Sequence, residues 1–166
     1  GRGYPLCAVE KIQLPLAEND RDLAYSALYD AIEGLPDSIS IESIANMLEL
    51  SMGLSAWKKY GASEWALRMN PSSGNLHPTE CYLVLPNLAR QKACVTHYNP
   101  YLHALEERAL LDQSQALWLE SCGGFGIILT SIPWREAWKY GERAFRYCQH
   151  DLGHALGALR YSCNLN

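Results

Sequence analysis

The segment from residue 68 to residue 78 constrains the fold more than any other part of this 166-residue chain. Its eleven residues include two prolines, two asparagines, two serines and one glycine. Because proline lacks a backbone N–H and the other residues favour turns, the segment cannot be a regular strand or a long helix from its first residue. We therefore expect a structured loop, which can end at the N-terminus of a helix.

Two helices are expected before this loop. Residues 20–34 carry apolar side chains at helical spacing, followed by Pro36, which stops the pattern. Ser40 can cap a second helix, whose apolar stripe ends at Gly53. Residues 54–67 are rich in Trp and Lys, and we interpret them as loop and turn with a short helical piece.

Three apolar runs after the loop are typical of β-strands. Residues 81–85 are closed by Pro86 and residues 93–98 by Pro100 and the asparagine before it, so we expect these two runs to form a hairpin. Residues 126–130 are continuously apolar, which indicates a central strand. Together the patterns predict an α+β fold with one mainly antiparallel sheet flanked by helices.

Helical patterns cover residues 101–111, 113–121 and 136–163. In the last and longest of them, Gly153 and Gly157 lie four residues apart on one face. Glycine lowers helix propensity but lets another backbone come close, so we expect a buried, tightly packed helix. The chain ends directly after this helix, and we expect further structure to continue from that point.

The composition argues against two classes of partner. The chain has a net charge of -4 and 19% charged residues, so it lacks the basic surface that binds nucleic acid or anionic membranes. No apolar run approaches the roughly 20 residues of a membrane-spanning helix, and the N-terminus lacks the apolar stretch of a signal peptide. Six cysteines without a C-x-x-C pair indicate reduced thiols. We expect a soluble, cytoplasmic protein.

The loop at residues 68–78 is also the strongest candidate for a binding site. It presents backbone N–H groups, Ser hydroxyls, an Asn amide and the Arg68 guanidinium within eight residues. Such groups hold cofactors that have an anionic, polyhydroxylated tail. Since any loop contains turn residues, the residues alone leave an ordinary connector as an equal alternative.

Two motifs carry a resemblance to a known family. Residues 71–84 read PSSGNLHPTECYLV, which resembles the P-S-[SA]-G-x-x-x-P-x-E-x-Y-x-V segment of the flavin-dependent nitroreductase-like superfamily. Residues 139–147 read KYGERAFRY and resemble a motif of the thiazoline/oxazoline dehydrogenases (the SagB type), which mature azole-containing peptides. Residues 151–154, DLGH, are similar to the [DE]-x-G-H that follows this motif in the family. The similarity extends from about residue 41 to residue 166.

This resemblance implies a nitroreductase-like α+β fold, with residues 1–166 forming a single domain or one half of a tandem or dimeric unit. Proteins of this kind are FMN-binding dimers in which each flavin lies at the subunit interface. The implied activity is an FMN-dependent oxidoreductase, in which the flavin accepts a hydride from a small molecule or an azoline-type peptide. The implied flavin-contacting residues are Arg68, Pro71, Ser72, Ser73, Gly74 and Asn75.

The resemblance also implies a catalytic pair, Lys139 and Tyr140. A lysine whose pKa is lowered by burial or by Arg143 can remove a proton from an azoline, with the tyrosine as donor or relay. Without the resemblance, a solvated helix start explains the pair better. In the same way, Arg143 and Arg146 either position an anion or pair with acidic neighbours on the helix.

Two elements of the family pattern are missing from the sequence. The family's R-R-S-x-R segment, which grips the flavin phosphate, should precede the second helix, yet no arginine occurs between Arg21 and Arg68. The glycine-rich element that follows the long helix is also missing. Two alternatives therefore stay open: one half of a larger or tandem protein, or a non-catalytic nitroreductase-like scaffold.

A zinc-dependent hydrolase is a further alternative. His150 and His154 are spaced as in the H-E-x-x-H zinc proteases. However, Asp151 replaces the Glu general base with a shorter arm, and spacing does not mark Cys148 or His77 as a third ligand. We therefore predict no metal site and keep the hydrolase as the less favoured alternative.

Overall fold

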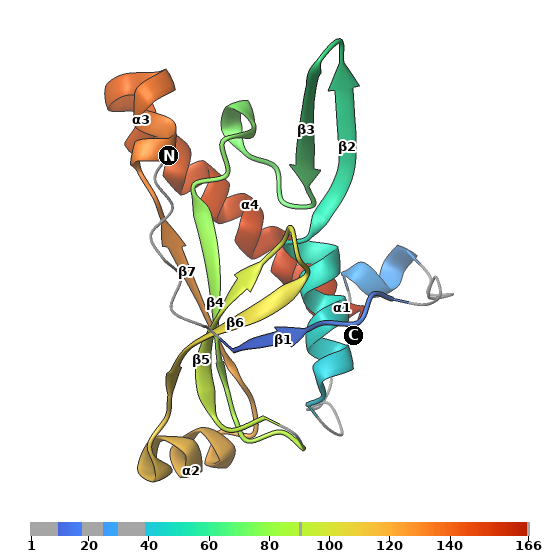
Figure 1. The fold of residues 1–166 in the computed structure, drawn as a ribbon, viewed down its shortest axis with the longest axis vertical. Coiled ribbons are helices and arrows are strands. Elements are labelled where there is room, and N and C mark those ends of the chain that lie inside the picture. The colour runs from blue at the N-terminus through green and yellow to red at the C-terminus, as the bar shows by residue number, and fades with distance from the viewer. Residues whose placement is uncertain (1–9, 18–24, 30–38, 90, 166) are drawn as a thin grey trace.

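The computed structural model describes residues 10–17, 25–29, 39–89 and 91–165 (Figure 1). The strands are β1 (Lys11–Gln13), β2 (Leu54–Tyr60), β3 (Ser63–Arg68), β4 (Thr79–Leu85), β5 (Cys94–Asn99), β6 (Ala104–Leu110) and β7 (Gly126–Ser131). The α-helices are α1 (Ile41–Ser51), α2 (Gln113–Ser121), α3 (Trp134–Tyr140) and α4 (Ala144–Asn164). Short 3-10 turns are η1 (Tyr25–Leu28), η2 (Ser73–Asn75) and η3 (Gly141–Arg143).

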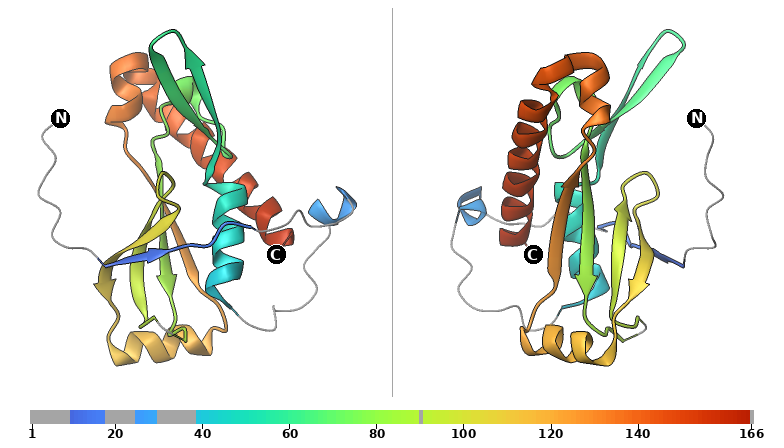
Figure 2. Two further views of the ribbon diagram at one scale, coloured as in Figure 1. Left: turned by 45° about the vertical axis from the view of Figure 1, so that its right-hand side comes forward. Right: turned by 90° about the vertical axis from the view of Figure 1, so that its left-hand side faces the viewer.

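A five-stranded antiparallel sheet forms the centre of the fold, with the strand order β1-β6-β5-β4-β7. Alternate residues of β4 are buried, and they pack with α1 and α4 in one hydrophobic core. Figure 2 shows both helices on the same face of the sheet. The expected α+β architecture is therefore confirmed. Among the described residues, no helix is both long enough and apolar enough to cross a membrane.

Helix α1 and the β4–β5 hairpin follow the sequence predictions. Ser40 caps α1 by accepting a hydrogen bond from the Ser43 N–H (3.1 Å), and the Ser43 hydroxyl oxygen accepts one from the Ser40 N–H (3.2 Å). β4 and β5 pair as a hairpin, as their apolar runs indicated. Most of the helix predicted at residues 20–34 lies outside the described residues, and the described part, residues 25–29, contains η1.

The interpretation of residues 54–67 as loop and turn is wrong. They form most of the β2–β3 hairpin, which projects away from the five-stranded sheet (Figure 1). Gly61 makes the turn with a left-handed backbone (φ 57°), which glycine adopts without steric cost. Most side chains on this hairpin are exposed, so the strands lack the apolar alternation that marks a half-buried strand.

The helix predicted at residues 101–111 is wrong as well. This segment contains β6, which pairs with β5 on one side and β1 on the other. Its sequence, ALEERAL, consists of residues with good helix propensity. Pairing along both edges satisfies the backbone hydrogen bonds in the sheet and overrides this local preference.

The strand at residues 126–130 is confirmed, but its predicted central position is wrong. β7 lies at the edge of the described sheet and pairs with β4 alone. Its side chains are half-buried or exposed, with Ile128 46% accessible. An apolar run thus indicated the strand but not its place in the sheet.

The single long helix predicted at residues 136–163 is interrupted. Gly141 has φ 56° and ψ -130°, a conformation that ends α3, and α4 begins at Ala144 after the η3 turn. One face of α4 is buried, but a Cβ added at Gly153 or Gly157 would meet no described atom within 4 Å. The tight packing expected at these two glycines is therefore not formed within the described chain.

Candidate functional site

The loop at residues 71–78 is held against α4 by one buried aspartate. The Ser72 hydroxyl donates to one oxygen of Asp151 (2.6 Å), and the Ser73 backbone N–H donates to the other (3.1 Å). The Ser72 oxygen in turn accepts from the His77 N–H (2.8 Å). Asp151 has no exposed surface. A carboxylate that accepts two hydrogen bonds is a strong anchor, so this aspartate determines where the loop lies.

Gly74 is the point at which the two sequence motifs meet. Its backbone is left-handed (φ 65°), and a Cβ at this position would lie 2.6 Å from both the Lys139 Nζ and the Tyr140 hydroxyl oxygen. The phenol ring of Tyr140 packs against Tyr147 (4.3 Å between centroids), and the Arg143 guanidinium lies over both rings. The fold therefore brings the loop and the Lys-Tyr pair into direct contact.

A Gly74→Ala substitution should displace Lys139 and Tyr140 without unfolding the protein. The added methyl group meets only the ends of two flexible side chains, while the left-handed backbone costs alanine about 1–2 kcal/mol. We expect a stability loss of this size together with shifted Tyr140 resonances in NMR spectra. Gly61→Ala is the matched control, because it has a similar φ (57°) but no atom within 4 Å of its added Cβ. Equal resonance shifts in both variants would contradict the contact at Gly74.

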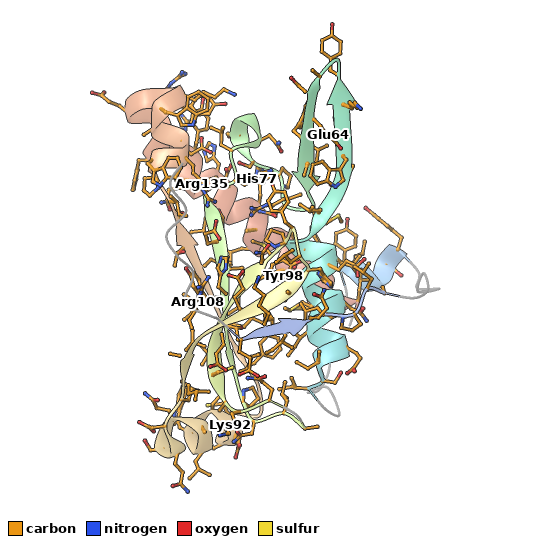
Figure 3. All side chains as sticks on the ribbon, in the orientation of Figure 1. Glu64, His77, Lys92, Tyr98, Arg108 and Arg135 are labelled. Atoms are coloured by element: carbon orange, nitrogen blue, oxygen red, sulfur yellow. The ribbon has the colours of Figure 1, made fainter. Side chains whose placement is uncertain are left out.

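Two arginines surround a neutral histidine at the end of the loop. Arg68, the last residue of β3, makes one long hydrogen bond to the Thr79 carbonyl (3.4 Å). Arg135 donates to the His77 carbonyl (2.8 Å) and to the Glu80 carboxylate. Burial, with both guanidinium groups nearby, lowers the pKa of His77 to about 4. The imidazole is therefore uncharged at neutral pH, and the two arginines carry the positive charge around it. Figure 3 labels His77 and Arg135, which lie close together at this end of the loop.

Asn75 connects the loop to the β2–β3 hairpin. Its side-chain amide donates to the Ala66 carbonyl on β3 (2.9 Å), and its oxygen lies 2.7 Å from the His77 Nε2. The Asn75 backbone is left-handed as well (φ 58°). Both polar atoms of this side chain thus have partners inside the protein.

Some of the predicted site residues are used to hold the loop in place, and others are free to contact a ligand. The side chains of Ser72 and Asn75 are engaged in holding the loop, and Pro71 is exposed. Arg68 keeps most of its N–H donors unused among the described residues. Lys139 is exposed, so the burial that we expected to activate its amine is not seen.

Sequence reasoning did not foresee two acidic residues that lie beneath this site. Asp151 belonged to a recognised motif, but its hydrogen bonds to the loop depend on how α4 packs. Glu136 was noted only as the first residue of a helical pattern, yet it is fully buried. For Asp151 the available signal was its place on the helix face that also carries Cys148 and Ala155, both of which are buried.

One histidine of the hydrolase alternative, His150, lies edge-on to the ring of Tyr147 (6.3 Å between centroids), which itself packs against Tyr140. His150 and His154 are exposed on α4. Asp151, which would have to act as the general base, is instead committed to Ser72 and Ser73. Within the described parts of the chain, no three His, Cys, Asp or Glu side chains are grouped so that they could hold a metal ion.

Comparison with protein-family models and with curated proteins gives no match. Among solved structures, a protein of Anabaena variabilis described as a nitroreductase is 30% identical over 74% of this chain, with a TM-score of 0.64. This chain covers 26% of that protein's length. A Ralstonia eutropha protein with the same description is 14% identical and has a TM-score of 0.65. The match covers 93% of this chain and 71% of the Ralstonia chain.

A third similar structure is the E. coli microcin synthetase complex McbBCD with truncated pro-MccB17 bound. It is 22% identical over 89% of this chain and 60% of the matched chain, with a TM-score of 0.57. The α+β topology and these three neighbours agree. The protein has a nitroreductase-like fold, with a five-stranded antiparallel sheet flanked by helices.

Proposed function

We propose that the protein is an FMN-dependent oxidoreductase whose flavin lies beside the loop at residues 68–75. The observation that carries this proposal is the contact at Gly74, where the loop touches both Lys139 and Tyr140. These are the groups that the family resemblance assigns to cofactor binding and catalysis, and the fold makes them neighbours. The nitroreductase-like fold supports the same conclusion.

The chemistry of the unused donors fits a flavin. Arg68 is half-buried and charged, yet its one hydrogen bond to the protein among the described residues is long (3.4 Å). An arginine in this situation is available for a ligand with several acceptor oxygens, and the carbonyl edge and phosphate of FMN supply them. The Ser73 backbone N–H is occupied by Asp151, so its hydroxyl is the group that this residue can offer.

Lys139 and Tyr140 are the proposed catalytic residues. When FMN is bound, its ring supplies hydride-accepting chemistry that no side chain can provide. Lys139 would take up a substrate proton at Nζ, and Tyr140 would donate or relay a proton at its hydroxyl. The placement of both atoms against Gly74 supports this assignment of the two roles.

We propose an azoline-type peptide as the substrate, with a small molecule as the alternative. The peptide-bound microcin synthetase complex supports the first choice by its similar fold. We further propose that residues 1–166 act as one domain of a homodimer or of a tandem pseudo-dimer. The exposed face of α4, with Phe145 75% and Leu156 56% accessible, offers an apolar surface for this contact.

Arg68→Ala should weaken FMN binding by more than roughly tenfold, because a hydrogen bond to a charged group contributes about 1.5–3 kcal/mol. Titration of the purified protein with FMN, followed by flavin fluorescence, measures the affinity. Lys92→Ala, which removes an exposed cation between β4 and β5, is the control and should leave the affinity unchanged. Unchanged binding in the Arg68 variant would remove the loop from the flavin site. Absence of FMN binding by the unaltered protein would favour the non-catalytic scaffold.

A further inference from the structure

Glu136 is a buried carboxyl group with no hydrogen-bond partner among the described residues. It lies in the first turn of α3, has no exposed surface, and neither carboxylate oxygen has a hydrogen bond within the described structure. The titratable groups near it are Asp151 and Cys148 on α4 and Lys139 on its own helix. No step of the proposed reaction uses this group.

The surroundings of Glu136 favour its protonated form. An ionised carboxylate is costly to bury without hydrogen bonds, and a second buried carboxylate close by adds repulsion. Burial and the neighbouring Asp151 both raise the pKa of Glu136, and Lys139 offsets only part of this effect. Asp151 accepts two hydrogen bonds from the loop, so it is the member of the pair that is stabilised as an anion.

We propose that Glu136 is a positioning residue, whose buried and unpaired carboxyl group keeps its proton to a higher pH than an exposed glutamate does, so that Asp151 alone holds the loop as a carboxylate over that range. With Glu136 neutral, Asp151 holds Ser72 and Ser73, and Gly74 stays in contact with Lys139 and Tyr140. Loss of the Glu136 proton places two carboxylates together in a buried space and weakens this hold. The inference goes beyond the proposed function, because it concerns the loop with or without a cofactor.

The sign of the pH dependence follows from the raised pKa. A carboxyl group with a higher pKa in the folded state stabilises that state fully below its unfolded pKa, about 4.5, and loses this contribution as the pH rises through the folded value. The hydrogen bonds from Ser72 and Ser73 to Asp151 should therefore weaken as the pH rises through the titration of Glu136. Glu136→Gln, which cannot ionise, should keep the loop bound to Asp151 throughout this pH range.

The test measures two properties of the protein without added flavin. Carboxyl carbon NMR of glutamate-labelled protein reports the titration of Glu136 directly, with Glu136→Gln identifying its signal. Hydrogen exchange reports the Ser73 amide, which donates to Asp151. As Glu136 ionises, the protection factor of the Ser73 amide should fall. The fall should be about tenfold for each unit by which the pKa of Glu136 is higher with the loop bound to Asp151 than with the loop detached from it. The Gln115 amide, which donates to exposed Asp112 (2.9 Å), should show no such step.

Glu142→Gln, which alters an exposed acid next to the Lys-Tyr pair, is the matched control and should retain the pH-dependent step. Titration of Glu136 in the ordinary range of an exposed glutamate would overturn the proposal. So would a Ser73 protection profile that is the same with glutamate or glutamine at position 136. If the glutamine variant does not fold, the titration of the unaltered protein still decides the question. Since no FMN is present, a failure here is separate from a failure of the proposed function.

Discussion

Asp151→Ala should lower the free energy of unfolding by about 3–5 kcal/mol. Removing one partner of a buried, charge-assisted hydrogen-bond pair has an effect of this size, because the remaining donors are left without an acceptor. Here the Ser72 hydroxyl and the Ser73 N–H, both on half-buried residues, lose their acceptor, and the fully buried Asp151 side chain leaves a space behind. Urea unfolding followed by circular dichroism measures the change.

The matched control is Asp112→Ala. Asp112 also accepts from a backbone N–H and a serine hydroxyl, at 2.9 and 2.7 Å, but it is exposed at the N-terminus of α2. Water can replace its contacts, so its loss should be clearly smaller. Equal losses of unfolding free energy in the two variants would show that the burial of Asp151 adds nothing to the stability that its hydrogen bonds to the loop provide.

Lys139→Ala should lower turnover by roughly 10²–10⁴ while flavin content is preserved, if Lys139 is the proposed base. The contact with Gly74 places its amine at the loop, so its loss removes a proton acceptor and leaves Arg68 and the loop intact. The rate at which a thiazoline-containing peptide bleaches the flavin absorbance under anaerobic conditions measures the reaction. Flavin content is read from the absorbance before the peptide is added.

Lys58→Ala, on the exposed face of the β2–β3 hairpin, is the control for loss of a surface lysine and should react like the unaltered protein. A colourless Lys139→Ala protein would make this residue a cofactor ligand instead of a base. Full activity in that variant would show that Lys139 is an ordinary solvated lysine of a helix and takes no part in the reaction.

The sequence predicted the parts of the site that depend on local chemistry. Proline and glycine between residues 71 and 78 excluded regular structure, and the two motifs singled out the loop and Lys139 with Tyr140. Their contact at Gly74 required the folded structure. The acids beneath the loop, Asp151 and Glu136, were not predicted as part of the site because their burial depends on how α3 and α4 pack.

By itself, the sequence determined the α+β class, the cap of α1, the β4–β5 hairpin and the irregular loop, because each depends on residues close together in the chain. Only the tertiary structure decided that helix-forming residues make β6 and that β7 lies at an edge. It also decided that Asp151 holds the loop. Strand pairing and burial join residues far apart in the chain, and their combined free energy exceeds the local propensities that a sequence pattern reports.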